Sequence, residues 1–219
     1  MRLTSKLSLA SAALLVGVWG QGAQAASIST TNLGSVSGKV TKTGTLTDEA
    51  QVIEEAFMLS AVSDLTVFTT SYGGGTNLNG TTTPPGGFQP MVTLYDSAGN
   101  YVMGEEVTSP IANTDPKTDA ALDAYLKSTS LKPGGYIVTL TDIFNQQPIT
   151  ATNLSDGFTG VGGPAFADVQ GNTRNGNFAL NLSVTPASSA VPEPASFWLV
   201  LLPLAGIALL IRKCRAAES

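Results

Sequence analysis

The stretch Asn177-Phe178-Ala179-Leu180-Asn181-Leu182-Ser183-Val184 decides the fold class. Its large apolar side chains recur at every second residue, and small or polar residues stand between them. Successive side chains of a β-strand point to opposite faces of a sheet, so this pattern predicts a strand with one buried face.

The same period of two recurs upstream in Leu65-Thr66-Val67, in Val92-Thr93-Leu94 and in residues 136–140. Residues 56–59 also suit a strand, although 52–59 taken alone could be helical. Turn signals rich in Gly and Pro separate these runs, and short strands punctuated in this way predict an antiparallel sandwich. The predicted core consists of Phe57, Leu65, Val67, Val92, Leu94, Val138, Leu140, Phe178, Leu180 and Leu182.

Two segments depart from this rhythm. Residues 73–87 are too rich in Gly and Pro for a regular ladder and are predicted to form a long polar loop. Residues 119–131 fit either a short helix or an irregular edge strand. No internal repeat divides the chain, so we expect one domain over residues 36–185.

The composition excludes several classes of chemistry. The sequence has no His and a single Cys, Cys214, which rules out His-based catalysis, imidazole metal sites and an intramolecular disulfide. Residues 26–191 contain six basic and fourteen acidic residues, a net charge of about −8. Such a surface repels phosphate backbones, so we expect no binding to nucleic acid.

The first 25 residues have the order of a secretory signal peptide. Arg2 and Lys6 precede an apolar stretch over 7–19, and Ala23-Gln24-Ala25 follows it. Small residues in an A-x-A arrangement mark the cleavage site, so we expect cleavage after Ala25. Residues 26–35 are then predicted to be an N-terminal linker.

The other end predicts a membrane anchor. Residues 186–191 read as a second linker, and the apolar run 195–211 is about as long as the shortest helix that spans a bilayer. Arg212, Lys213 and Arg215 follow it as a basic stop. Basic residues on that side alone place the tail inside the cell and the sandwich outside.

Pro192-Glu193-Pro194, the apolar run and the basic cluster together resemble the PEP-CTERM sorting signal of Gram-negative bacteria that make exopolysaccharide, over residues 192–219. The resemblance implies that Pro192, Glu193 and Pro194 are recognised by exosortase, an integral-membrane Cys protease or transpeptidase. It also implies a precursor anchored in the inner membrane, and then a place at the cell surface or in the extracellular matrix. Whether the tail is cleaved or retained stays open.

The middle of the chain resembles exported domains associated with PEP-CTERM tails, which are akin to bacterial pre-peptidase C-terminal domains. The resemblance rests on Gly44-Thr45-Leu46, Asp156-Gly157-Phe158 and the runs 65–72, 88–95, 131–136 and 174–182. It implies an all-β, jelly-roll-like antiparallel β-sandwich, flanked by the signal peptide and the transmembrane sorting helix.

Carboxylate pairs are the main catalytic option that the composition leaves, as in glycoside hydrolysis. A Ser/Lys dyad from Lys127 or Lys132 with Ser128 or Ser130 is chemically conceivable, but nothing in the spacing favours it. Neighbours such as Glu54 and Glu55 on a strand point to opposite faces and cannot form an acid/base pair. Glu105-Glu106 has the same limitation. We therefore expect a protein that is not an enzyme and needs no cofactor.

The leading hypothesis is an exported protein with a structural role in an exopolysaccharide or biofilm matrix, whose partners are exosortase and then exopolysaccharide or matrix proteins. The alternative is a module that binds carbohydrate or calcium. Asp115, Asp119 and Asp123 could supply oxygen ligands to calcium, although their spacing equally describes one wet helix face. Loop aromatics could stack on sugars or could close the ends of the core. The alternating row Thr41, Thr43, Thr45 and Thr47 suggests ice binding, but the repeated flat scaffold that this needs is absent.

Overall fold

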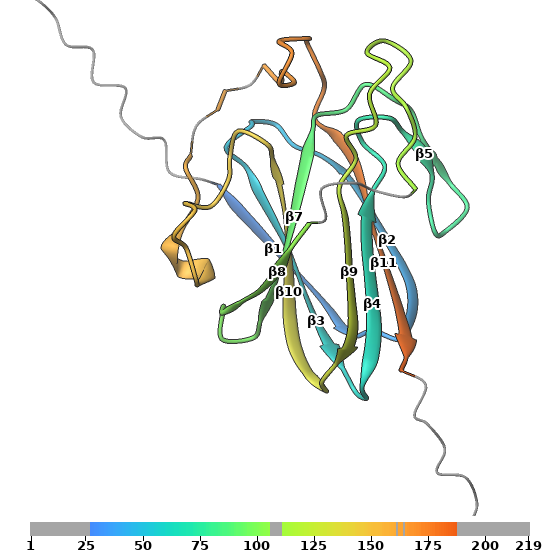
Figure 1. Cartoon of the computed structure of the whole chain (residues 1–219), viewed down its shortest axis with the longest axis vertical. Coiled ribbons are helices and arrows are strands. Elements are labelled where there is room, and N and C mark those ends of the chain that lie inside the picture. Colours follow the sequence, from blue (N-terminus) through green and yellow to red (C-terminus); the bar gives the residue numbers. More distant parts are fainter. Residues whose placement is uncertain (1–26, 106–110, 161, 164, 188–219) are drawn as a thin grey trace, which may run out of the picture.

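The computed structural model describes residues 27–105, 111–160, 162–163 and 165–187 (Figure 1). The signal peptide with Ala23 and Ala25, the sorting residues 192–194 and the basic stop Arg212, Lys213 and Arg215 lie outside them, as does the apolar run 195–211. The described strands are β1 (Ile28–Ser35), β2 (Gly38–Thr45), β3 (Val52–Leu59), β4 (Ser63–Thr69), β5 (Gly75–Thr76), β6 (Thr82–Thr83), β7 (Pro90–Asp96), β8 (Tyr101–Gly104), β9 (Tyr125–Leu131), β10 (Gly134–Asp142) and β11 (Asn177–Pro186), with one 3₁₀ helix, η1 (Leu154–Asp156).

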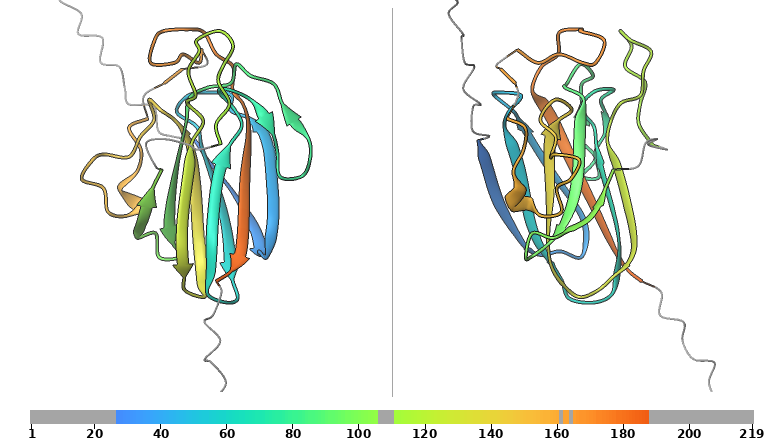
Figure 2. Two further views of the ribbon diagram at one scale, coloured as in Figure 1. Left: turned by 45° about the vertical axis from the view of Figure 1, so that its right-hand side comes forward. Right: turned by 60° about the vertical axis from the view of Figure 1, so that its left-hand side comes forward.

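The described residues form an all-β sandwich of two stacked sheets (Figure 2). The first sheet has the order β1-β3-β10-β7-β8 and the second has the order β2-β11-β4-β9. β1 and β2 follow one another in the chain but belong to different sheets. Both are edge strands, and both lie on the same side of the sandwich, which places a free strand edge on each sheet there.

The core lies between the sheets, and all ten predicted core residues are buried there. Leu180 and Leu182 of β11 point inward as the alternation predicts, with no exposed surface, and they belong to the apolar cluster between the sheets. The opposite face is not open to solvent, because Ala179 and Asn181 are fully buried too. Burial of apolar surface stabilises the fold by about 25 cal/mol for each Å² removed from water.

The prediction of a linker over 26–35 is wrong, because Ile28–Ser35 forms β1. This strand pairs with β3 in parallel, whereas the other described strand pairs are antiparallel. The parallel pair corrects the prediction of an antiparallel sandwich at this one edge. β1 is mostly exposed and shows no apolar alternation. Its backbone hydrogen bonds hold it in the sheet, and these leave no signal in side-chain periodicity.

Residues 52–59 and 119–131, for which the sequence allowed either a helix or a strand, both contain a strand. Residues 52–59 form β3, which is central enough to pair on both sides. Within 119–131, Tyr125–Leu131 forms β9, an edge strand with a register shift against β4. The irregular edge strand was therefore the correct alternative of the two, and no helix forms in the described part of this segment.

The polar loop 73–87 packs on the outer face of the second sheet. The amide nitrogen of Asn181 on β11 donates to Asn77 Oδ1 at 3.2 Å, and the backbone N–H of Leu78 donates to Asn181 Oδ1 at 3.0 Å. Thr41, from the threonine row of β2, donates to the same Asn181 oxygen at 2.8 Å. This threonine therefore belongs to a local polar network.

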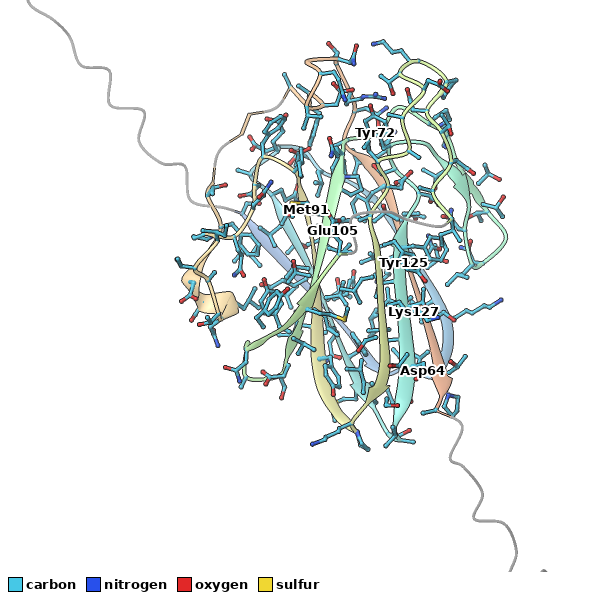
Figure 3. All side chains as sticks on the ribbon, in the orientation of Figure 1. Asp64, Tyr72, Met91, Glu105, Tyr125 and Lys127 are labelled. Atoms are coloured by element: carbon cyan, nitrogen blue, oxygen red, sulfur yellow. The ribbon has the colours of Figure 1, made fainter. Side chains whose placement is uncertain are left out.

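Long loops and tight turns lie at opposite ends of the sandwich. Figure 3 shows Tyr72 near the end that carries the long loops and Asp64 near the other end. β11 runs from the loop end to the turn end, and the described chain leaves from there after Pro186 (Figure 1). Among the described residues, no helix is long and apolar enough to cross a bilayer.

Candidate functional site

The structure does not bring the predicted calcium ligands together. Asp115 and Asp123 are buried in different contacts, and Asp119 is exposed, with a backbone φ of 55°. The described residues hold no group of three or more His, Cys, Asp or Glu side chains that could bind a metal ion. The four-residue spacing of these aspartates does not place them on one helix face either, because residues 115–123 form no helix.

Asp115 instead forms half of a buried ionic cluster around Arg174. Arg174 Nη1 lies 2.9 Å from Asp115 Oδ2, and Arg174 Nη2 lies 2.7 Å from Asp168 Oδ2. The exposed fractions of these side chains are 1% for Arg174, 2% for Asp115 and 0% for Asp168. The guanidinium carbon also sits 3.8 Å from the centre of the Tyr72 ring, a cation–π contact.

Electrostatics keeps both aspartates of this cluster ionised. Burial opposes the charged form of Asp115 and of Asp168, but the hydrogen bonds from Arg174 and from neighbouring donors together outweigh it and lower the pKa of each carboxyl. Backbone N–H groups assist, since Thr118 donates to Asp115 Oδ1 and Asn172 donates to Asp168 Oδ1. The cluster therefore joins three loops at one end of the sandwich, and all three nitrogens of the Arg174 guanidinium donate to partners within it.

Asp123 has an equally internal role. One of its oxygens, Oδ1, accepts hydrogen bonds from the backbone N–H of Ser71 at 2.5 Å and from Thr69 Oγ1 at 2.9 Å, and Oδ2 accepts from the Gly73 N–H at 2.8 Å. The carboxylate therefore fixes the chain where β4 ends and the polar loop begins.

Of the four aromatic residues predicted near loops as sugar platforms, Tyr72, Phe88, Tyr101 and Tyr125, only Tyr101 is exposed. Tyr72 and Phe88 have no exposed surface and Tyr125 is 8% exposed, so these three close the ends of the core. Tyr101 is 51% exposed and lines a groove of about 390 Å³ together with Met91, Gln147 and other residues. Gln147 is already engaged there, because it accepts from Tyr95 Oη at 2.5 Å and donates to the Asn153 carbonyl at 3.1 Å.

Two carboxyl groups, the buried Asp142 and the partly buried Glu105, have pKa values raised to about 7. Burial is the main cause for both Asp142 and Glu105, and the nearby charge of Glu49 adds to the shift of Asp142. Asp142 has no exposed surface and Glu49 is 8% exposed. A raised pKa next to a second carboxylate is a feature of acid/base pairs. Asp142 and Glu49 are both buried, however, so they do not face a substrate.

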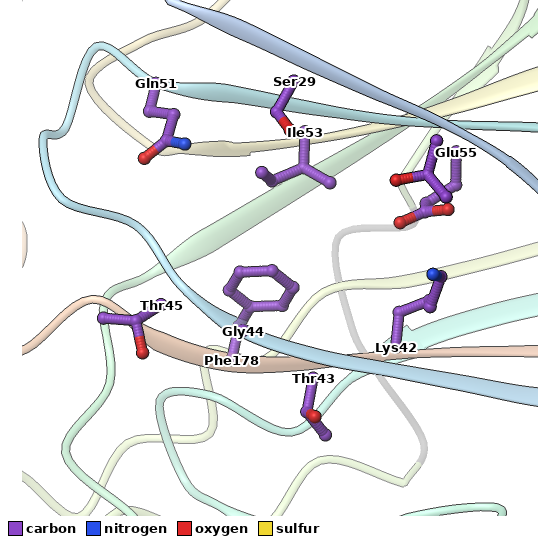
Figure 4. Close-up of a pocket in the computed structure, with 10 residues that line it drawn as sticks. Ser29, Lys42, Thr43, Gly44, Thr45, Gln51, Ile53, Glu55 and Phe178 are labelled. Atoms are coloured by element: carbon purple, nitrogen blue, oxygen red, sulfur yellow. The ribbon is translucent and has the colours of Figure 1, made fainter.

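A second cavity opens between the two sheets on the side where β1 and β2 form their edges. It has a volume of about 260 Å³ and we call it the edge slot (Figure 4). Its upper wall comes from β1 and the start of β3, and its lower wall comes from β2 and β11. It is lined by Ser29, Thr31, Lys42, Thr43, Gly44, Thr45, Gln51, Ile53, Glu55 and Phe178.

The two members of the Glu54-Glu55 doublet point to opposite faces, as predicted. Glu54 accepts a hydrogen bond from Thr30 Oγ1 at 2.8 Å on the outer face, whereas Glu55 lines the edge slot. Burial raises the pKa of Glu55, and the charge of Lys42 partly opposes that shift.

Sequence reasoning missed both the Arg174 cluster and the edge slot. Arg174 is the only Arg in residues 26–191, which is a signal for a buried, paired cation, but its partners Asp115 and Asp168 cannot be inferred from spacing. Glu55 could have been placed, because it shares the inward phase of Phe57 two residues later.

No family model matches the chain, and no curated protein matches its sequence. Its structure is distantly similar to small bacterial β-sandwich proteins. The pre-peptidase C-terminal domain of a collagenase from Bacillus anthracis matches with a TM-score of 0.36 and 12% identity, over 72% of this chain and 95% of that domain. PliG, a periplasmic inhibitor of g-type lysozyme from Aeromonas hydrophila, matches with a TM-score of 0.39 and 9% identity, over 73% and 98%. CorA, a surface-associated copper-binding protein of Methylomicrobium album BG8, matches with a TM-score of 0.33 and 12% identity, over 73% and 100%.

Proposed function

We propose that this chain is an exported, non-enzymatic protein of the cell surface or extracellular matrix, sorted by exosortase through its C-terminal tail. The observation that carries the proposal is the order of segments: a signal peptide, one complete sandwich ending at Pro186, and then Pro192-Glu193-Pro194, an apolar run and a basic stop. We extend the proposal to a structural role in an exopolysaccharide or biofilm matrix, with a jelly-roll-like arrangement of the sandwich.

The internal use of the acidic residues supports a role without catalysis. Asp115 and Asp168 hold Arg174, and Asp123 holds the chain at the end of β4. Asp142 and Glu49 are enclosed. Glycoside hydrolysis needs two carboxyl groups facing each other across an accessible cleft, and among the described residues these acids do not provide one.

The position of the chain exit supports surface display. The described chain leaves the sandwich at the end that carries the tight turns, and the long loops gather at the other end (Figure 1). A tail anchored in the inner membrane would therefore hold the loop end away from the bilayer.

The test follows the tail in a Gram-negative host that carries an exosortase. The tagged full chain is compared with a Pro192→Ala, Glu193→Ala, Pro194→Ala variant by cell fractionation and by mass. Glu218→Ala is the control, in the same tail but outside the three recognition residues and the basic stop. We expect the wild-type chain and the control to leave the inner membrane as a processed form, while the triple variant accumulates as a membrane precursor. Identical processing of all three chains, or of the wild-type chain in a host lacking exosortase, would refute the proposal.

A further inference from the structure

The edge slot places side chains from both sheets face to face. Ser29 and Thr31 on β1 pair with Ile53 and Glu55 on β3, so these four side chains share the inward face of the first sheet. On the second sheet Lys42 pairs with the core residue Leu180 and shares its inward direction. Figure 4 shows Lys42 and Glu55 extending into the slot from opposite walls.

Glu55 carries an acceptor without a partner in this slot. The residue is 3% exposed, and its Oε2 atom has no hydrogen-bond partner among the described residues. A buried polar group that lacks a partner is costly, and the cost is larger for a charged one. The other described atoms in that state belong to Gln89, Glu105 and Asp142, and none of these residues lines the slot.

Lys42 faces this acceptor without neutralising it. The two ion pairs among the described residues both belong to Arg174, so the ammonium group of Lys42 does not close an ion pair on Glu55. Its charge still acts at a distance, because it opposes the rise in the pKa of Glu55. The slot therefore presents a free acceptor on one wall and a cationic donor on the other.

We infer that the edge slot binds a neutral, hydroxyl-rich ligand, namely a sugar unit. A hydroxyl group donates one hydrogen bond and accepts others, so it can donate to Glu55 and accept from Lys42 at the same time. An anion would face the carboxylate of Glu55, and a cation would face the ammonium of Lys42. The hydroxyls of Ser29 and Thr31 add two more groups of matching chemistry at the mouth.

The apolar part of the slot fits the same ligand class. Phe178 and Ile53 line it beside the polar groups, and sugars combine hydroxyl groups with C–H faces that pack on aromatic rings. Gly44 leaves room for the ring, because a Cβ atom there would approach Phe178 Cζ to 2.8 Å. The volume of about 260 Å³ lies just under the range of about 300–1,000 Å³ for drug-sized ligands, so it suits one sugar unit of a chain.

This inference rests on the slot alone and holds whether or not the proposal on sorting is correct. The experiment is a titration of the ¹⁵N-labelled full chain in a detergent without sugar headgroups, followed by NMR. The probes are D-glucose, D-galactose, D-mannose and N-acetyl-D-glucosamine, with D-glucuronate and D-glucosamine as charged probes. We expect at least one neutral sugar to cause saturable shifts at the backbone amides of Ser29, Gly44 and Glu55.

Two variants test the roles of the facing groups, and two matched variants on the same strands control for them. Glu55→Gln and Lys42→Met should each weaken the binding of the neutral sugar by about ten-fold or more, the loss of one charge-assisted hydrogen bond. Glu54→Gln and Lys39→Met, which alter the outer faces of β3 and β2, should leave it unchanged. Circular dichroism melts confirm folding, and Glu55→Gln should melt no lower than the wild-type chain because it removes a buried charge.

Several outcomes would overturn the inference. They are the absence of saturable shifts with every neutral sugar, binding of the charged probes alone, and equal affinity of Glu55→Gln and the wild-type chain. Shifts confined to the Tyr101 groove would also overturn it, because they would place the sugar on the outer face of the first sheet.

Discussion

Replacement of Arg174 by Met should be among the most damaging single substitutions in the described residues. Arg174 is the only cation in a cluster that also contains Asp115 and Asp168, at 2.9 Å and 2.7 Å from its nitrogens. Met keeps much of the side-chain volume but leaves two buried carboxylates unneutralised. Removal of one partner from a buried ion pair costs about 3–5 kcal/mol, and we expect a loss in this range at pH 7.

The two carboxylates do not lose all of their partners, which keeps the expected loss within that range. The Thr118 N–H still donates to Asp115 Oδ1 at 3.0 Å, and the Asn172 N–H donates to Asp168 Oδ1 at 2.8 Å. A domain is stable by only about 5–15 kcal/mol. The substitution therefore removes a large fraction of the free energy of unfolding without necessarily abolishing the fold.

The assay is urea unfolding of the full chain, followed by far-UV circular dichroism at pH 7 and at pH 4.5. Arg174 lowers the pKa of both aspartates, and without it burial raises them, so the variant should recover stability as acid protonates these groups. Adding Asp115→Asn and Asp168→Asn to Arg174→Met should restore stability in the same way. Lys117→Met, at an exposed position beside the cluster, should change stability by less than about 0.5 kcal/mol.

A loss below about 1 kcal/mol at pH 7 would show that the cluster is not the buried ionic centre that we describe. A loss of equal size at both pH values would refute the electrostatic reasoning, because packing defects alone do not respond to protonation of Asp115 and Asp168.

Two further predictions concern the core and the buried carboxyl groups. Leu180→Asp should destabilise the chain by more than about 4 kcal/mol in the same assay, because it places a charge in the core. Ser183→Asp, on the outer face of β11, is the control. Equal stability of the two variants would contradict the strand assignment. Asp142 keeps its proton up to about pH 7 in the folded chain but loses it near pH 3.8 when unfolded, so folding is favoured at low pH and stability falls as the pH rises through this window. Asp142→Asn should remove about 2–3 kcal/mol of the loss between pH 5 and pH 8. An unaltered slope in Asp142→Asn would contradict the assignment.

Residues 177–184 show why much of the fold could be predicted. An antiparallel strand with one buried face must alternate, so Leu180 and Leu182 reveal themselves in the sequence. β1 could not be found in this way, because Ile28–Ser35 is mostly exposed and joins its sheet through backbone pairing with β3. Backbone hydrogen bonds are available to every residue type except Pro as a donor, so they leave little pattern in the sequence.

The candidate sites show a related limit. Asp115, Asp119 and Asp123 are close in sequence, and proximity in sequence suggested a shared ligand. The role of Asp115 is instead set by a partner that is distant in sequence, because Arg174 is 59 residues away. The inward direction of Glu55 was available from the phase of β3, but its meeting with Lys42 depends on which edges of the two sheets come together, and that is a property of topology.

The edge slot and the point where the described chain leaves the sandwich lie toward opposite ends of β11. Phe178, which lines the slot, stands near the start of β11, and the described chain leaves after Pro186 at its other end. Eight residue steps of about 3.4 Å separate them by about 27 Å along an extended strand. A chain held by its tail would keep the slot on the side of the sandwich, away from the anchor.

Binding and processing should then be separable: Glu55→Gln should leave processing of the tail intact, and the Ala substitutions at 192–194 should leave sugar affinity intact. A change in either cross-measurement would mean that the two functions share a surface, which this arrangement of the strand does not allow.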